Sequence, residues 1–135
     1  AKVCFRKQKS PIMSNSDHDL IQETIQTYFD SMYESDPAKV HEAFHPDAKI
    51  TGYLNGELHE MTVPTFADMV AGQQPSAKEK DEAIQLETVS LEIAGDTAVA
   101  RVRDGYIGLI FLDTLSFLKT EGDWVIYNKL FHVES

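Results

Sequence analysis

The second half of the chain contains four apolar segments in a row, each of strand length and separated from the next by a short turn. They are residues 84–93, 97–106, 109–119 and 124–133. The turns contain glycines such as Gly95 and Gly122, which is typical of tight connections between antiparallel strands. In the first segment the apolar alternation shifts between Leu86 and Val89, which indicates a β-bulge. This half therefore predicts a bent antiparallel meander with a concave face.

The beginning of the chain is expected to be helical. From a cap at Ser16 or Asp17, apolar residues recur at three- and four-residue spacing as far as Met32, which is the pattern of an amphipathic helix. A second helix is expected to begin at Asp36-Pro37, to carry Phe44 on its inner face and to end at Pro46. Both helices would bury one apolar side.

A short strand at residues 48–53 should turn back at the Asn55-Gly56 pair, and a third helix should begin after a cap at Thr62 or Thr65. Helices that come before a bent sheet are typical of folds in which the helices cover one sheet face. We therefore predict an α+β fold, with three N-terminal helices packed on a strongly curved, mostly antiparallel sheet.

The length of 135 residues suits one domain, which we place at residues 16–135. Residues 1–15 are expected to be a disordered leader, either expression-derived or translated from upstream of Met13, and a functional basic arm is the alternative. The net charge of −10 disfavours nucleic-acid binding, and no apolar run is long enough to span a membrane. A single cysteine, Cys4, and no secretion signal suit a reducing, cytoplasmic setting.

Three short runs carry a resemblance to a known family: FHPDA at residues 44–48, GYLNGEL at 52–58 and FLDTLSFLK at 111–119. With the terminal GDWVIYNK run, they resemble the NTF2-like superfamily of SnoaL-like and ketosteroid isomerase-like cones, and within it the lumazine-binding protein family. The resemblance covers residues 17–133. It implies a cone with an internal apolar pocket and a homodimer formed through the outer sheet face, but no settled activity.

Alternation along the strands assigns side chains to the concave face. The polar residues expected there are Asp104, Asp113, Asn128 and His132. The apolar residues expected to form the pocket wall are Phe29, Met32, Phe66, Met69 and Phe111. On the last strand, the same alternation places Lys129 and Phe131 on the outer face. A few polar groups in an apolar cavity are typical of a small-ligand site.

The resemblance to ketosteroid isomerase implies a role for two of the polar groups. Tyr28 and Asp113 match the two hydrogen-bond donors that stabilise an enolate oxygen in that enzyme. The position that matches its general base is Gly52, so the same isomerisation would need a relocated base. The candidates for that base are His45, Tyr53 and Glu57.

Each polar candidate also has a structural explanation. Tyr28 could be a core aromatic residue, and Asp113 a buried carboxyl bonded to Tyr28 or His132. Asn128 could satisfy backbone groups, and His132 could be a structural or frayed terminal residue. No carboxylate has a metal-triad spacing to His41 and His45, so we expect no metal site. We also expect no cofactor.

Three functions fit these observations. The first is a homodimeric protein that binds a small apolar or carbonyl-bearing ligand, with Tyr28 and Asp113 as anchors. The second is an isomerase, dehydratase or cyclase in which Tyr28 and Asp113 are catalytic. The third is a non-catalytic assembly module, whose cavity would be plugged by Met32, Phe66 and Met69.

Overall fold

The computed structural model describes residues 16–135, so the leader expected at residues 1–15 lies outside the described residues. The described elements alternate between helices and strands only in the first half, as the sequence predicted. The helices are α2 (Asp17–Tyr33), α3 (Pro37–Ala43) and α4 (Val63–Ala71). The strands are β1 (Phe44–Leu54), β2 (Glu57–Thr62), β3 (Leu86–Ala94), β4 (Thr97–Tyr106), β5 (Leu109–Thr120) and β6 (Asp123–Val133).

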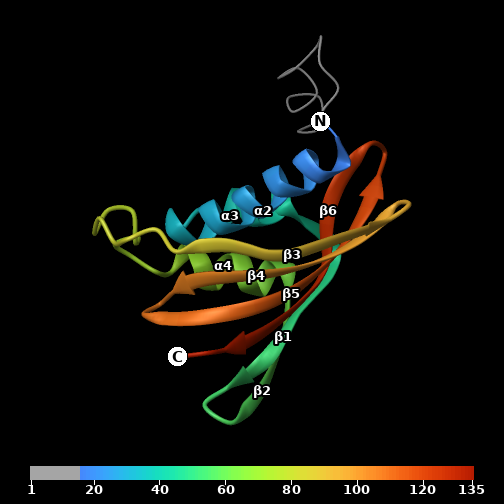
Figure 1. Cartoon of the computed structure of the whole chain (residues 1–135). Coiled ribbons are helices and arrows are strands. Elements are labelled where there is room, and N and C mark those ends of the chain that lie inside the picture. Colours follow the sequence, from blue (N-terminus) through green and yellow to red (C-terminus); the bar gives the residue numbers. More distant parts are fainter. Residues whose placement is uncertain (1–15) are drawn as a thin grey trace.

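The strands form one six-stranded sheet in the order β2-β1-β6-β5-β4-β3. Every neighbouring pair is antiparallel except β1 and β6, which run parallel. The three helices lie together on one side of the bent sheet, and the β1–β2 hairpin extends beyond them (Figure 1). The expected α+β fold with a curved, mostly antiparallel sheet is therefore confirmed.

The helices begin where their capping residues predicted. The Asp19 amide donates to Ser16 Oγ at the start of α2, at 3.1 Å. Asp36 caps α3, and the Thr65 amide donates to the Thr62 hydroxyl at the start of α4. Each side chain satisfies an amide that has no partner within its own helix.

The second helix ends earlier than the sequence predicted. It stops at Ala43, and Phe44 already has the extended conformation of β1. Pro46 lies inside that strand, in the irregular stretch between Phe44 and Lys49 where the pairing with β6 shifts register. Proline has no amide to donate and disfavours helical geometry in the residue before it, so the irregular strand start accommodates it. The placement of Phe44 on a helix was wrong.

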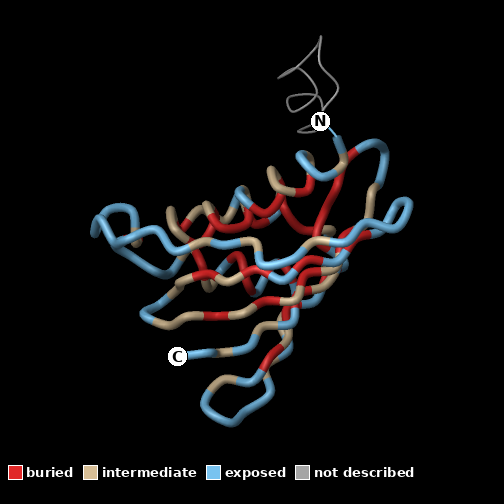
Figure 2. The backbone as a smooth tube through the Cα atoms, viewed as in Figure 1, coloured by how far each residue is buried: buried red, intermediate tan, exposed pale blue. Residues whose placement is uncertain are grey.

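The core lies between the helices and the concave face of the sheet. Figure 2 shows buried backbone where these two layers face each other and an exposed tip on the β1–β2 hairpin. At the end of the core nearest the start of β6, Trp124 is fully buried and its indole nitrogen donates to Asp17 at 3.0 Å. The Thr24 hydroxyl donates to the Trp124 carbonyl at 2.9 Å, which fixes α2 to β6.

Two irregularities bend the outer strands. The pairing of β3 with β4 shifts between Thr88 and Ser90, so Val89 is the extra residue of a bulge. This confirms the bulge expected from the sequence. A second shift separates Ser116 from Phe117 in the pairing of β5 with β6, where Tyr127 is the extra residue. An extra residue reverses the side-chain alternation beyond it, and this second bulge decides which residues of β6 face inward.

Candidate functional site

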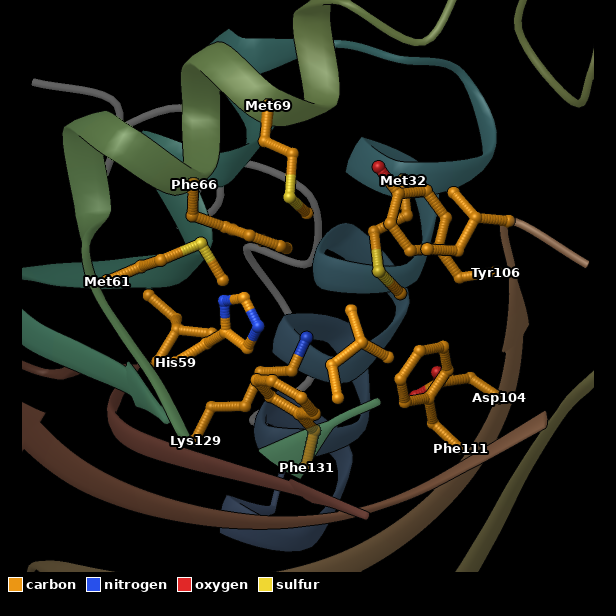
Figure 3. A pocket seen from close by; sticks show the side chains of 13 residues that line it. Met32, His59, Met61, Phe66, Met69, Asp104, Tyr106, Phe111, Lys129 and Phe131 are labelled. Carbon is orange, nitrogen blue, oxygen red and sulfur yellow. The ribbon is translucent and has the colours of Figure 1, made fainter. Parts of the chain in front are cut away.

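A cavity of about 150 Å³ opens at the end of the core away from Trp124, and it draws its walls from both helices and strands (Figure 3). Almost all of its surface is apolar. The lining residues are Met32, Ile50, Leu54, His59, Met61, Phe66, Met69, Asp104, Tyr106, Ile107, Phe111, Lys129 and Phe131. Five of the ten ligand-binding residues expected from the sequence are among them: Met32, Phe66, Met69, Asp104 and Phe111.

Three methionine side chains make the cavity wall adaptable. Met32 comes from α2, Met61 from β2 and Met69 from α4, and their flexible thioether chains border the open volume in Figure 3. Unbranched methionine side chains can repack around ligands of different shape. Met32, Phe66 and Met69 therefore line the cavity and leave it open.

The bulge at Tyr127 corrects the predicted inner face of β6. Beyond it, Lys129 is buried and lines the cavity, whereas Asn128 and His132 belong to the opposite face and His132 is exposed. The inward placement of Asn128 and His132 was wrong, because the extra residue shifts the alternation by one position. The same shift overturns the expectation that Lys129 and Phe131 face outward.

Lys129 occupies an aromatic environment inside the cavity. Only 5% of its surface is exposed, and its Nζ lies 4.6 Å from the ring centre of Phe66, 4.8 Å from that of Tyr28 and 5.8 Å from that of Phe131. Aromatic faces attract an ammonium group. Within residues 16–135, no carboxylate forms an ion pair with Lys129 and no acceptor takes a hydrogen bond from it. The amine is thus available to a ligand.

Tyr28 and Asp113 lie together behind the cavity wall. The Tyr28 hydroxyl donates to Asp113 Oδ2 at 2.5 Å, and both residues are fully buried. Neither lines the cavity, and neither does Phe29, which stacks on Tyr33 with ring centres 5.6 Å apart. The two groups expected to anchor a ligand thus contact each other, as one structural explanation of Asp113 required.

Asp104 connects this buried pair to the cavity. It lies on β4, diagonally across from Asp113 on β5, because Val102 is the residue directly opposite Asp113. Burial, followed by the hydrogen bond and charge of neighbouring Asp113, raises the pKa of Asp104 from 3.8 to about 10, although the positive charge of Lys129 opposes the rise. At neutral pH the Asp104 carboxyl is therefore protonated. A protonated carboxyl can donate a hydrogen bond to a ligand oxygen.

Burial also keeps the two nearby phenols neutral. It is the main cause that raises the pKa of Tyr28 well above its usual value, and the charges of Asp104 and Asp113 add to it. Burial raises the pKa of Tyr106 to about 12. The Tyr106 hydroxyl has no hydrogen-bond partner in the described part of the chain. It therefore remains a donor at the edge of the cavity.

Gly52 shows why the isomerase base is missing. A Cβ atom at this position would lie 2.5 Å from both the Phe131 carbonyl oxygen and the ring atom Cδ1. Any side chain on Gly52 would therefore collide with Phe131, which is its partner on β6. The glycine gives the Phe131 ring its place in the cavity wall, at a position where the resemblance implied a carboxylate.

The candidates for a relocated base lie elsewhere. None of His45, Tyr53 and Glu57 lines the cavity. His45 accepts a hydrogen bond from the Asp47 amide, and Tyr53 is 65% exposed. His59, on the same hairpin as Glu57, does line the cavity.

The two lining residues of β6 that were not predicted, Lys129 and Phe131, share one cause. The run Trp124-Val125-Ile126-Tyr127 is apolar at every position, so it does not define the alternation on β6. The only signal for the orientation of the β6 side chains was this uninterrupted apolar run, which is typical of a strand buried on both faces. Without the position of the bulge, Lys129 and Phe131 could not be assigned to the cavity.

Residues 16–135 contain no group of three or more His, Cys, Asp or Glu side chains arranged to hold a metal ion. The helices of the same region are too short or too polar to cross a membrane.

A model of the family described as "Putative lumazine-binding" matches residues 16–132. The chain belongs to this family. A curated relative of this lumazine-binding family member is Aldolase FrzH from Cladobotryum sp, which is 24% identical over 120 residues and covers 89% of this chain and 94% of its own length.

Solved structures confirm the NTF2-like fold of this family member. A protein of unknown function from Silicibacter pomeroyi is 24% identical with a TM-score of 0.81, over 90% of this chain and 100% of that one. Another from Methylobacillus flagellatus is 28% identical with a TM-score of 0.79, over 92% and 97% of the two chains. Both are NTF2-like proteins, so the superfamily expected from the sequence is confirmed.

Proposed function

We propose that this protein binds a small, mostly apolar molecule that carries a carbonyl group. The observation that carries the proposal is that two polar atoms of a mostly apolar cavity, Lys129 Nζ and Asp104 Oδ2, have no hydrogen-bond partner among the described residues. Both are hydrogen-bond donors at neutral pH, and a carbonyl oxygen is an acceptor. A buried donor without a partner gains most from a ligand that supplies one.

Membership of the lumazine-binding family supports a small-molecule ligand. The polar groups in the wall are few, and the aromatic and methionine side chains would surround an apolar body. The anchors assigned here are Lys129 and Asp104. Tyr28 and Asp113 are not anchors in this proposal, because the Tyr28 hydroxyl already donates to Asp113 and neither residue lines the cavity.

Binding of acetophenone and isopropylbenzene tests this function, because the two have similar shapes and only the first has a carbonyl. We expect the wild-type protein to bind acetophenone more tightly, and Lys129→Met to weaken acetophenone about tenfold, as expected for one lost hydrogen bond to a charged donor. The variant should leave isopropylbenzene binding unchanged. Lys49→Met, at an exposed site on β1, is the control. Equal binding of both compounds to wild-type protein and variant would refute the proposal.

Catalysis at the same carbonyl is the second candidate. Protonated Asp104 could stabilise an enolate oxygen, and Lys129 and His59 are the basic side chains of the cavity. The similarity to Aldolase FrzH supports chemistry of this kind. Exchange of the acetophenone methyl protons in D2O, followed by NMR, measures enolate formation directly. A rate equal to that of the buffer would exclude this reaction for acetophenone.

A homodimer through the outer sheet face is proposed as well. Exposed apolar side chains occur along that face, including Tyr127 and Leu130 on β6 and Val99 on β4. Exposed apolar groups on one sheet face favour burial against a partner. Light scattering after size-exclusion chromatography should give a dimer for the wild-type protein and a monomer for Leu130→Glu. A wild-type monomer would contradict this assembly.

A further inference from the structure

We infer that Lys129 captures the carbonyl ligand covalently, as an imine formed between its Nζ and the carbonyl carbon of an aldehyde or ketone. This inference rests on the proposed function, because the ligand must first enter the cavity. It adds a nucleophilic role to a residue that a hydrogen-bonding site would use only as a donor.

The position of the amine supports a nucleophilic role. Lys129 is 5% exposed, and Figure 3 shows its side chain reaching from β6 into the cavity between Phe66 and Phe131. The aromatic rings exclude water from the sides of the amine but leave it facing the open volume. A lysine in an apolar pocket is a recurrent nucleophile towards carbonyl compounds.

Lys129 has no ion pair with another side chain of the described residues. The described residues provide no carboxylate within ion-pair distance of Lys129 Nζ and no acceptor for its hydrogen bonds. A buried lysine that served only the fold would be expected to have such a partner. Instead, its Nζ lies over the rings of Phe66 and Tyr28. A lone amine directed into a cavity is therefore better explained by a ligand.

The proposed reaction requires no oxidant or reductant. The Lys129 ammonium first loses a proton to water, and the neutral amine attacks the carbonyl carbon to form a C–N bond. The carbonyl oxygen takes the proton of the Asp104 carboxyl, and the nitrogen returns a proton to Asp104, which leaves a neutral carbinolamine. Asp104 then protonates the hydroxyl, the C–O bond breaks, and water leaves. The products are a protonated imine, an Asp104 carboxylate and one water molecule.

Asp104 is placed to serve as the proton donor because it lines the same cavity as Lys129. Its pKa of about 10 keeps the proton on the carboxyl at neutral pH, which supports the assignment. The protonated imine and the Asp104 carboxylate would then form the ion pair that Lys129 lacks in the free protein. This pairing would stabilise the captured ligand.

Reductive trapping with benzaldehyde and cyanoborohydride tests the inference on the wild-type protein. Reduction converts the imine to a stable benzyl-lysine, which peptide mapping by mass spectrometry locates. We expect benzylation of Lys129 to be about tenfold faster than that of exposed Lys49, because the cavity holds the aldehyde beside the Lys129 amine. Lys129→Met should lose the fast phase, whereas Lys49→Arg should keep it. Circular dichroism checks that both variants fold.

Benzyl alcohol separates the failure of this inference from that of the proposed function. It resembles benzaldehyde in shape but cannot form an imine, and ligand-observed NMR detects its binding. If benzyl alcohol competes for the cavity while Lys129 is benzylated no faster than Lys49, the covalent step is refuted and noncovalent binding remains. If neither compound enters the cavity, both proposals fail. Fast trapping of Lys129 that benzyl alcohol suppresses would support both.

Discussion

The two halves of β6 lie in the same sheet between the same neighbours, but they have different surroundings. Residues 123–126 are all buried and pack at the closed end of the core, where Trp124 is joined to α2. From Tyr127 to Val133 the burial alternates, and one side of the strand borders the cavity. The change occurs at the bulge, so one extra residue separates a close-packed region from a hollow one.

This difference shows how a single strand can serve both stability and binding. At the closed end the side chains pack against protein neighbours, and the Trp124 indole donates a hydrogen bond to Asp17. At the hollow end, Lys129 Nζ and Asp104 Oδ2 have no hydrogen-bond partner among the described residues, and both residues line the cavity. Buried polar groups without a hydrogen-bond partner destabilise the fold, and a ligand that supplies the missing partner stabilises it again.

The largest effect is expected from truncating aromatic residues on either side of the bulge. Trp124→Ala should destabilise the protein by about 3–5 kcal/mol, because it removes a fully buried side chain and leaves a void. Phe131→Ala should cost only about 1–2 kcal/mol, since the ring is half-buried and already borders a cavity. Urea unfolding followed by circular dichroism measures both values. Equal losses would contradict the distinction between the two halves.

An intermediate effect is expected at Gly52, on the strand beside the hollow half. Gly52→Ala should cost about 1–3 kcal/mol and narrow the cavity, because the new Cβ collides with the Phe131 ring and with its carbonyl oxygen. In a Phe131→Ala background the cost should fall but not vanish, since the carbonyl oxygen remains. Gly72→Ala is the control, because a Cβ there has ordinary contacts of 3.5 Å. Unfolding free energies of the single and double variants measure the coupling.

The protonated Asp104 carboxyl should make stability depend on pH. In the folded protein its pKa is raised from 3.8 to about 10. The contribution of this carboxyl to the free energy of unfolding is therefore fully present below about pH 4 and is lost as the pH rises towards 10. Asp104→Asn keeps a neutral side chain at every pH. The difference between variant and wild type should therefore change by about 1.4 kcal/mol per pH unit, so that Asp104→Asn is relatively more stable at about pH 7 than at about pH 6 by that amount.

Unfolding free energies at the two pH values, measured for wild type and variant, check this sign. Asp96→Asn at an exposed turn makes the same chemical change and should show no such difference. An Asp104→Asn variant that loses the same free energy at both pH values would show that the Asp104 carboxyl is already ionised in the folded protein. That result would also remove the proton donor from the proposed imine chemistry.

The sequence predicted the fold well, because local signals defined most of its elements. Capping residues such as Ser16 and Thr62 marked the helix starts, and the shift of alternation near Val89 revealed the first bulge. Phe44 was misplaced because an apolar residue next to a helix fits either a helix face or a strand. The structure resolves this through the pairing of β1 with β6, which is a long-range interaction.

The candidate site was only partly predictable, because it depends on which way β6 turns its side chains. Asp104 and Phe111 were assigned correctly, since β4 and β5 alternate without interruption over that stretch. Lys129 was missed because the bulge at Tyr127 lies in an uninterrupted apolar run. The contact between Tyr28 and Asp113 spans 85 residues, and no local pattern indicates whether such a pair faces a ligand or itself.

The smallest effect, and the sharpest check of the bulge, is expected from His132→Ala. His132 is exposed on the face opposite the cavity, so the variant should change stability by less than about 0.5 kcal/mol. Acetophenone binding should be unchanged, whereas Lys129→Met, three residues earlier on the same strand, should weaken it. Without the extra residue at Tyr127, the two positions would exchange faces and the two results would be reversed. Measuring both variants side by side therefore reports the orientation of β6 in solution.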